Sequence, residues 1–315
     1  MLRRSMRMFC SVVAAALLFS NAACAEEFVR ISTSSIGGGF YQIGNTVSQL
    51  GNSMKNGINY TAITGGSAKN LIALSKRNAE FGLCQSAVIF QGITGTGPFK
   101  QPLKSLRFVT AVYPMPCHVL VNGDGIDGIA DFRGKKVDYG PIGEGIEVYT
   151  RIVLGAYAIS DDDVKINRFG KSESAEALKT GTVNCNFWAT TVPNAQVTDM
   201  ISGGVRLLPI DAPQLQTILK EHPYYSASVI PGGSYRGFEK DIPTFAAIGA
   251  IVTHDQVSDE VVYNTVKAMY ENAGFLKERL PNYFADFSLE HALDGCSMEV
   301  HPGALKYYKE VGLVK

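Results

Sequence analysis

Apolar residues in the first half of the chain alternate between the spacing of strands and the spacing of helices. Residues 28–33, 58–64 and 80–85 predict short strands. Between the first two, residues 39–54 place apolar side chains three or four positions apart, which puts them on one face of a helix. Strand, helix, strand, helix and strand in this order predict a parallel sheet with right-handed crossovers.

The same succession returns in the second half. Residues 135–140 predict a strand and residues 145–157 predict a helix. The segment 174–193 then repeats the helix, turn and strand of residues 70–88. Two similar α/β units predict an α/β protein with two lobes.

Two long apolar runs, residues 107–122 and 244–254, are predicted to cross between the lobes, and a helix is expected over residues 259–279. Pro114 and Pro116 interrupt the first run, which suits a strand that leaves one sheet for another. Two crossings describe a hinge that lets lobes close on a ligand. We therefore assign the chain as follows: 1–25 as a separate leader, 26–115 as lobe I, 116–248 as lobe II, and 249–315 as the return to lobe I.

The leader has the features of an export signal. It carries Arg3, Arg4 and Arg7, then a short apolar run, then a small-x-small pattern at residues 23–25. We expect cleavage after Ala25 and location in the periplasm. A lipoprotein acylated at Cys24 is the alternative. Without the leader, 26 basic residues face 29 acidic ones. No basic block predicts nucleic-acid binding.

Three glycine-rich bends precede predicted helices, at residues 37–44, 64–71 and 141–145. Such bends expose backbone N–H groups at helix starts, where anions bind. A tight turn or simple helix capping by Ser34, Ser35 or Ser67 would explain the same residues. Open α/β sheets bind ligands at the edge where these bends lie.

Two further residues draw attention near the predicted cleft. Glu144 would repel an anion there, so it either pairs with a ligand ammonium or only favours the positive end of the helix. Trp188, the single tryptophan, is either a core residue or a wall of the ligand pocket.

Four cysteines remain after the leader, at positions 84, 117, 185 and 296. In an oxidising compartment we predict a disulfide between Cys84 and Cys117, with buried free thiols as the alternative. The sequence has no HExxH zinc motif and no GxSxG elbow. We therefore expect no metal, no cofactor and no catalysis.

The ordered motifs SSIGGGFYQIG, ITGGSAKNL, EFGLCQS, DFRGKKVDYGPIGEGIE, HPYYSASVIPGGSY and VHPGALKYYKEVG span nearly the whole mature chain. Together they resemble the TAXI-type solute-binding subunits of tripartite ATP-independent periplasmic (TRAP) transporters. The resemblance implies a type II-like periplasmic-binding-protein fold with a buried ligand between two lobes. It also implies an acidic amino acid such as glutamate or a dicarboxylate such as 2-oxoglutarate as ligand, and a membrane permease as partner.

The resemblance also implies a set of ligand-binding residues. From the first lobe these are Ser34, Ser35, Gly38, Gly39, Tyr41, Ser67, Asn70 and Gln85, and from the second Gly143, Glu144 and Gly145, with Trp188 as a wall. The family often has Gly-Ser-Gly where this chain has Gly143-Glu144-Gly145, so the usual ligand is in question. We expect a monomer. The rival functions are an exported hydrolase or transferase and a sensor subunit that presents its ligand to a receptor.

Overall fold

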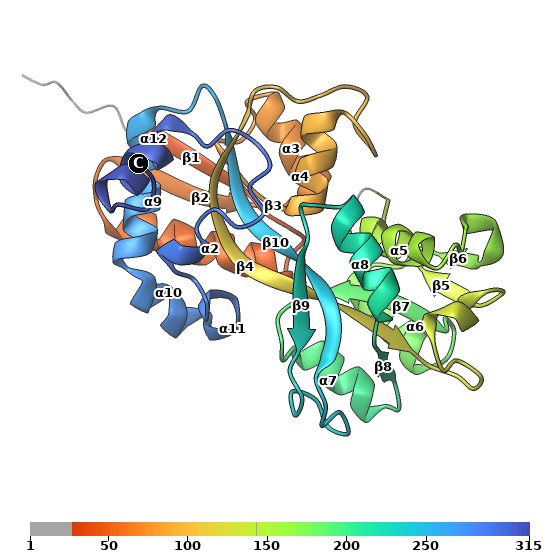
Figure 1. Cartoon of the computed structure of the whole chain (residues 1–315). Helices are drawn as coiled ribbons and strands as arrows, with labels where there is room; N and C mark the ends of the chain where they lie inside the picture. Colours follow the sequence, from red (N-terminus) through yellow and green to blue (C-terminus); the bar gives the residue numbers. More distant parts are fainter. Residues whose placement is uncertain (1–26, 143) are drawn as a thin grey trace, which may run out of the picture.

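The computed structural model describes residues 27–142 and 144–315. They form two α/β lobes joined by two long strands, which run across the middle of the molecule in Figure 1. The predicted two-lobed α/β architecture is confirmed. The predicted leader, with its cleavage site after Ala25 and the alternative at Cys24, lies outside the described residues, as does Gly143.

Lobe I contains the first sheet strands and most of the C-terminal helices. Its strands are β1 (Glu27–Ser32), β2 (Ile58–Ile63) and β3 (Phe81–Gln85). Its helices are α2 (Gly39–Ser53), α3 (Ser67–Ser75), α4 (Ser86–Thr94), α9 (Asp259–Glu271), α10 (Ala273–Arg279), α11 (Pro281–Phe284), the short η4 (Leu289–His291) and α12 (Pro302–Glu310). β1 pairs in parallel with both β2 and β3, as the alternating pattern predicts.

Lobe II repeats the arrangement on a smaller scale. Its strands are β5 (Lys136–Asp138), β6 (Lys165–Asn167), β7 (Cys185–Ala189), β8 (Arg206–Leu208) and β9 (Ser226–Ile230). Its helices are α5 (Gly145–Ala156), α6 (Lys171–Lys179), α7 (Ala195–Ser202), α8 (Ala212–Glu221) and the short η2 (Ile129–Phe132) and η3 (Asp161–Asp163). β5 pairs in parallel with β6 and β7.

The connecting strands are β4 (Leu106–Val121) and β10 (Ile242–His254), which are antiparallel to each other. β4 pairs with β10 as far as Pro116 and with β7 from Cys117 onward. β10 first pairs with β9 and then, from Gly249, also with β3. The pairing partners thus change close to the predicted lobe boundaries at 115/116 and 248/249; these boundaries themselves stay a prediction.

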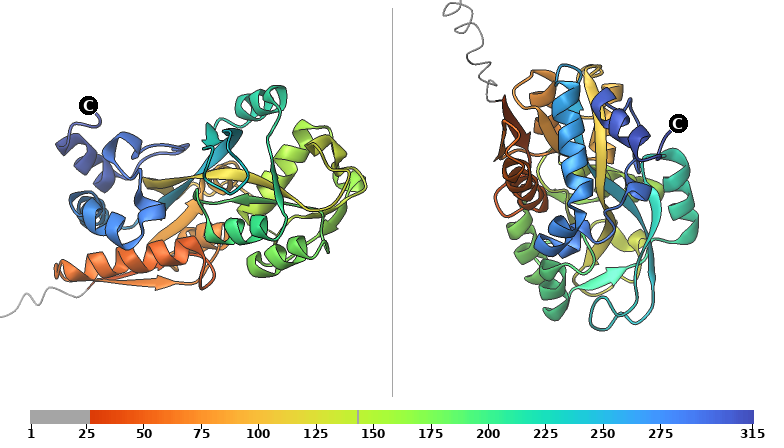
Figure 2. Two further views of the ribbon diagram at one scale, coloured as in Figure 1. Left: turned by 90° about the horizontal axis from the view of Figure 1, so that it is seen from below. Right: turned by 90° about the vertical axis from the view of Figure 1, so that its left-hand side faces the viewer.

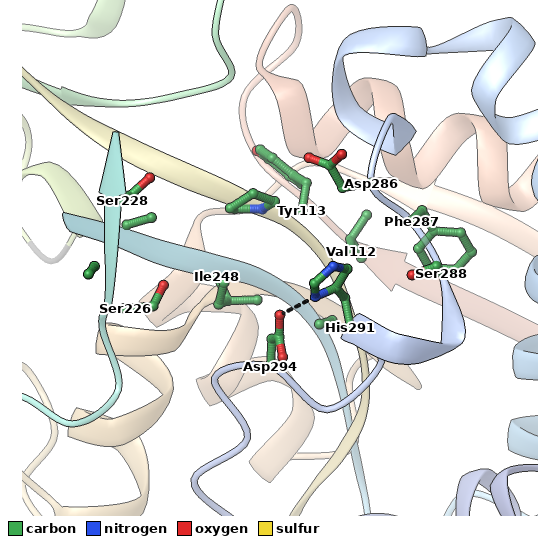
Figure 3. Close-up of a pocket in the computed structure, with 14 residues that line it drawn as sticks. Val112, Tyr113, Ser226, Ser228, Ile248, Asp286, Phe287, Ser288, His291 and Asp294 are labelled. Carbon is green, nitrogen blue, oxygen red and sulfur yellow. Dashed lines mark hydrogen bonds and ion pairs between the residues drawn. The ribbon is translucent and has the colours of Figure 1, made fainter. Parts of the chain in front are cut away.

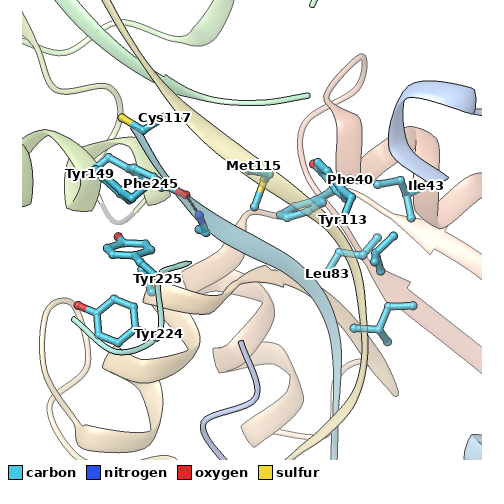
Figure 4. Packing of buried hydrophobic residues seen from close by; sticks show 14 of the residues in the cluster. Phe40, Ile43, Leu83, Tyr113, Met115, Cys117, Tyr149, Tyr224, Tyr225 and Phe245 are labelled. Atoms are coloured by element: carbon cyan, nitrogen blue, oxygen red, sulfur yellow. Dashed lines mark hydrogen bonds between the residues drawn. The ribbon is translucent and has the colours of Figure 1, made fainter. Parts of the chain in front are cut away.

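A continuous buried cluster follows the connecting strands from one lobe to the other, as Figure 4 shows. On the lobe II side the ring of Tyr149 from α5 stacks on Phe245 of β10, with ring centroids 5.4 Å apart. The Tyr149 hydroxyl accepts a hydrogen bond of 3.0 Å from the Ala247 N–H. Each such ring contributes a few kcal/mol through burial. The core therefore fixes helix α5, whose start faces the cleft between the lobes, on the connecting strand.

The C-terminal segment differs from its predicted form. Residues 259–279 form α9 and α10 rather than one helix, because Asn272 leaves the helical conformation with φ −115° and ψ 30°. α12 then packs against α9 in lobe I, and the C-terminus lies at this end of the molecule (Figure 2). Within the described residues, no helix has both the length and the apolar character needed to cross a membrane.

The predicted Cys84–Cys117 disulfide is wrong, and the alternative of buried free thiols holds. Cys84 lies on β3 and Cys117 on β4, and β10 lies between these two strands. The sheet therefore holds the two sulfur atoms too far apart for a bond. Burial raises the pKa of both thiols, so they stay protonated and unreactive.

Candidate functional site

A cavity of about 360 Å³ lies between the lobes and takes its walls from both. It contains most of the residues that the sequence analysis singled out. The predicted residues that line it are Ser34, Ser35, Gly38, Gly39, Ser67, Gln85, Glu144, Gly145 and Trp188. Glycine bends more than a hundred residues apart in the chain therefore meet around one space.

Four helices begin at this cavity. The first residues of α2, α3, α5 and α6 all line it: Gly39, Ser67, Gly145 and Lys171. The first turn of a helix has backbone N–H groups without partners inside the helix, and it carries partial positive charge. Two of these helices come from each lobe, so positive helix ends face the cavity from both sides.

The N–H groups at these helix starts are free to bind a ligand. Within residues 27–142 and 144–315, the following donate no hydrogen bond to the protein: the N–H groups of Gly39, Phe40, Ser67, Ala68, Lys69, Gly145, Ile146, Lys171, Ser172 and Glu173. No side chain caps α2, α3, α5 or α6 through a hydrogen bond. Helix ends left uncapped in this way are typical of anion-binding sites.

The first glycine bend is held in shape by Ser34. Its hydroxyl accepts a hydrogen bond of 3.1 Å from the Tyr41 N–H and lies 3.3 Å from the Ser35 carbonyl oxygen, to which it donates. Tyr41 itself does not line the cavity. The ring of Tyr283 lies at this part of the cavity instead. It packs against Gly39, where an added Cβ would lie 2.7 Å from the ring.

The second bend differs from its prediction in two respects. Gly66, rather than Ser67, is the N-cap of α3, and the Ser67 hydroxyl instead accepts a hydrogen bond of 3.3 Å from the Gln85 N–H. Asn70 does not line the cavity. Its buried amide accepts from the Ser32 hydroxyl and the Gly66 N–H, and donates to the carbonyl oxygens of Thr33 and Leu83. Asn70 therefore shapes the bend from behind.

Gln85 reaches across the cleft from lobe I to lobe II. Its Oε1 lies against Gly145 at the start of α5, where a Cβ would come within 1.3 Å of it. This buried oxygen accepts no hydrogen bond from the described residues, and the amide nitrogen has only the Met115 sulfur at 3.9 Å. Gln85 therefore presents an unused acceptor beside the cavity, and glycine at 145 leaves room for it.

Glu144 and Lys171 are the charged side chains among the described residues that line the cavity. They form no ion pair with each other. Both are exposed in the open cleft, yet the surrounding protein displaces enough water to raise the pKa of Glu144, an effect that Lys69 and Lys171 oppose. The same loss of water lowers the pKa of Lys171. One negative and one positive group thus face the same space.

Trp188 lies within β7 and is 2% exposed. Its indole Nε1–H, a donor, has no partner among the described residues although it is buried. Lys171 Nζ lies over the ring, 4.9 Å from its centroid. A buried donor without a partner carries a desolvation penalty, which a ligand oxygen can relieve.

Sequence analysis missed several cavity residues. Tyr113 on β4 and Tyr283 on α11 form an edge-to-face pair with centroids 5.2 Å apart, and Phe40 packs on Tyr113. Tyr283 has no local signal because it lies far along the chain from the other cavity residues. Lys171 does have one, since Gly170-Lys171 stands at a helix start, as the three bends do.

A second, smaller cavity of about 250 Å³ lies between β9 and the loop that contains η4 (Figure 3). His291 Nδ1 and Asp294 Oδ2 are 2.9 Å apart there. Tyr113 lines both cavities, but none of the predicted site residues lines this one. Within the described residues, no group of three or more His, Cys, Asp or Glu side chains is placed to hold a metal ion.

Comparison with known proteins places the chain in a family. Residues 31–312 match the model of the NMT1-like family. The chain belongs to the NMT1-like family. The match covers both lobes and both connecting strands.

Solved structures share the fold of this NMT1-like chain at low sequence identity. MatC from Rhodopseudomonas palustris with bound malate has a TM-score of 0.57 and 12% identity, over 91% of this chain and 97% of MatC. The periplasmic binding protein BugD has a TM-score of 0.56 and 14% identity, over 91% and 95%. An ancestral arginine-binding protein bound to arginine has a TM-score of 0.50 and 16% identity, over 82% and 98%.

These likenesses show the fold. The NMT1-like chain has the two-lobed α/β fold of periplasmic solute-binding proteins. Function is argued below from the cavity itself.

Proposed function

We propose that this protein is an extracytoplasmic solute-binding protein that captures a small carboxylate between its lobes and catalyses no reaction. One observation carries the proposal: four helix starts, whose first N–H groups donate no hydrogen bond within the described residues, face a single cavity between the two lobes. Backbone dipoles in this arrangement hold an anion without a strongly basic lining. Malate and arginine, which are bound in two structures of the same fold, both carry carboxylates.

The residues proposed to bind the ligand are those of the cavity. N–H groups at the starts of α2 and α3 hold a carboxylate from lobe I, with Ser34, Ser35 and Ser67 keeping the bends in shape. Lys171 and the Trp188 Nε1–H approach it from lobe II. Gly143, in the third bend, is proposed from the sequence alone.

The family resemblance in the sequence adds the transport step. We propose export by the leader to the periplasm, a monomeric protein, and delivery of the ligand to a TRAP permease driven by an ion gradient. Acidic amino acids and dicarboxylates are the first ligands to test.

A thermal-shift screen of the mature protein with small carboxylates tests capture. A ligand at tenfold excess over its Kd is expected to raise the free energy of unfolding by about 1.4 kcal/mol through mass action. Lys171→Met is expected to weaken the tightest hit, whereas Lys220→Met, an exposed lysine outside the cavity, is the matched control. If no small carboxylate stabilises the protein, the proposed capture function is wrong.

Vesicle uptake tests the transport step separately. With a candidate multi-span permease, uptake is expected to need this protein and an imposed ion gradient, and to proceed without ATP. Uptake that requires ATP hydrolysis would overturn the TRAP assignment while leaving capture intact.

A further inference from the structure

We propose that the ligand carries an ammonium group together with its carboxylate, and that Glu144 is the residue that selects for the ammonium. This inference rests on the proposed capture function and narrows its ligand class to amino acids. Oxo acids and dicarboxylates that lack an amino group are then poor ligands.

The charge of the cavity favours such a ligand. Its described lining has one carboxylate, Glu144, and one ammonium, Lys171, and these do not pair with each other. A cavity with one charge of each sign is complementary to a zwitterion, whose two charges meet opposite partners. A dicarboxylate would bring two negative charges beside Glu144, and like charges in a partly dehydrated site repel strongly.

Two buried polar groups without hydrogen-bond partners among the described residues also favour a ligand that has both an ammonium and a carboxylate. Trp188 Nε1–H is a buried donor without a partner among the described residues, and a ligand acceptor would satisfy it. Gln85 Oε1 is a buried acceptor that likewise lacks a partner in the described part of the chain, and a ligand donor would satisfy it. A carboxylate supplies only acceptors, so it satisfies the first group and leaves the second unsatisfied. An ammonium supplies three donors and satisfies the second.

The placement of these groups is consistent with one molecule. Gln85 Oε1 lies against Gly145, the residue that directly follows Glu144, so the start of α5 brings both residues to the cavity. Lys171 Nζ lies over the Trp188 ring, so the two donors stand together. The ligand ammonium therefore binds at the start of α5, and the ligand carboxylate binds to Lys171, Trp188 and the helix N–H groups.

Calorimetry with matched pairs of ligands tests this inference. Each amino acid is compared with the oxo acid of the same skeleton: L-glutamate with 2-oxoglutarate, and L-leucine with 4-methyl-2-oxopentanoate. Side chains of other sizes are covered by further pairs of the same kind. The amino acid that binds tightest is expected to exceed its oxo acid by at least about tenfold, the effect of one charge-assisted hydrogen bond.

Variants test whether Glu144 is the residue that selects for the ligand ammonium. Glu144→Gln is expected to remove most of the preference for the amino acid while binding of the oxo acid is unchanged or stronger. Lys171→Met is expected to weaken both members of a pair alike. Glu239→Gln, which changes an exposed carboxylate outside the cavity, is the matched control and is expected to keep the wild-type preference.

Each outcome decides a different point. An oxo acid or dicarboxylate that binds as tightly as its amino acid overturns the inference and leaves carboxylate capture intact. A preference that survives in Glu144→Gln overturns the role of Glu144. Absence of binding by every small carboxylate, with or without an amino group, overturns the capture function and this inference together.

Discussion

Single residues at this site divide into those that contact the cavity and those that hold its shape. Glu144 and Trp188 line the cavity, and their polar side-chain groups have no hydrogen-bond partner among the described residues, whereas Asn70 makes four hydrogen bonds behind the second bend. The sequence pointed to Asn70 and Glu144 by their place in glycine bends, and to Trp188 as the single tryptophan near the predicted cleft. It did not separate the two roles, because that depends on which way each side chain points.

Replacing Asn70 is therefore a test of stability. Asn70→Ala removes four buried hydrogen bonds and leaves their partners unsatisfied. We expect the free energy of unfolding to fall by roughly 2–4 kcal/mol in urea denaturation. Asn56→Ala, at an exposed asparagine, is the control, with an expected loss of less than about 1 kcal/mol. Equal stability of the two variants would contradict the structural role of Asn70.

Glu144 is expected to lower stability in the ligand-free protein. Loss of water raises its pKa in the folded chain, so the folded state binds the proton more tightly than the unfolded state. Stability then falls as the pH rises through the raised pKa. We expect Glu144→Gln to be more stable than wild type at pH 7, and the difference to vanish below pH 4.5, the ordinary pKa of glutamate.

Urea denaturation across this pH range measures the difference. Glu239→Gln provides the reference for loss of an exposed carboxylate. A Glu144→Gln protein that is less stable than wild type at pH 7 would show that the protein stabilises the carboxylate rather than the acid.

At the scale of elements, local sequence patterns were sufficient for a helix with one buried face and for a long apolar strand. The helix predicted at 39–54 is α2 at Gly39–Ser53, and the strand predicted at 107–122 is β4 at Leu106–Val121. The helix predicted at 259–279 breaks at Asn272. The apolar stripe continues past this residue, but the backbone leaves the helical conformation there. Tyr283 reaches the cavity only through the packing of α11 on β4, which no local pattern contains.

The start of α5 offers a prediction about one element. Gly145→Ala adds a methyl that overlaps Gln85 Oε1, and the flexible Gln85 side chain swings away. We expect an affinity loss of about tenfold for the tightest carboxylate, measured by calorimetry, with the fold intact by circular dichroism. Gly155→Ala is the control in the same helix, because its added methyl meets no atom within 4 Å. Wild-type affinity in Gly145→Ala would show that the position of Gln85 does not matter.

For the whole molecule, the two-lobed organisation was predictable because the α/β pattern occurs twice and two apolar runs connect the halves. The disulfide was not, because it depended on which strands are neighbours. β10, which lies between β3 and β4 in the sheet, begins only at Ile242, far along the chain from the end of β4 at Val121. The same two strands connect the lobes, since β4 and β10 exchange pairing partners between them.

Trp188 allows the most direct measurement of the central claim, that helix starts from both lobes capture one small carboxylate. It is the only tryptophan in the sequence and lines the cavity, so its fluorescence is sensitive to changes beside that space. Titration with small carboxylates is expected to give a saturable change in emission, with a Kd of about micromolar or lower for at least one of them. A folded protein whose emission stays constant with every small carboxylate, while calorimetry also detects no heat, would contradict the account.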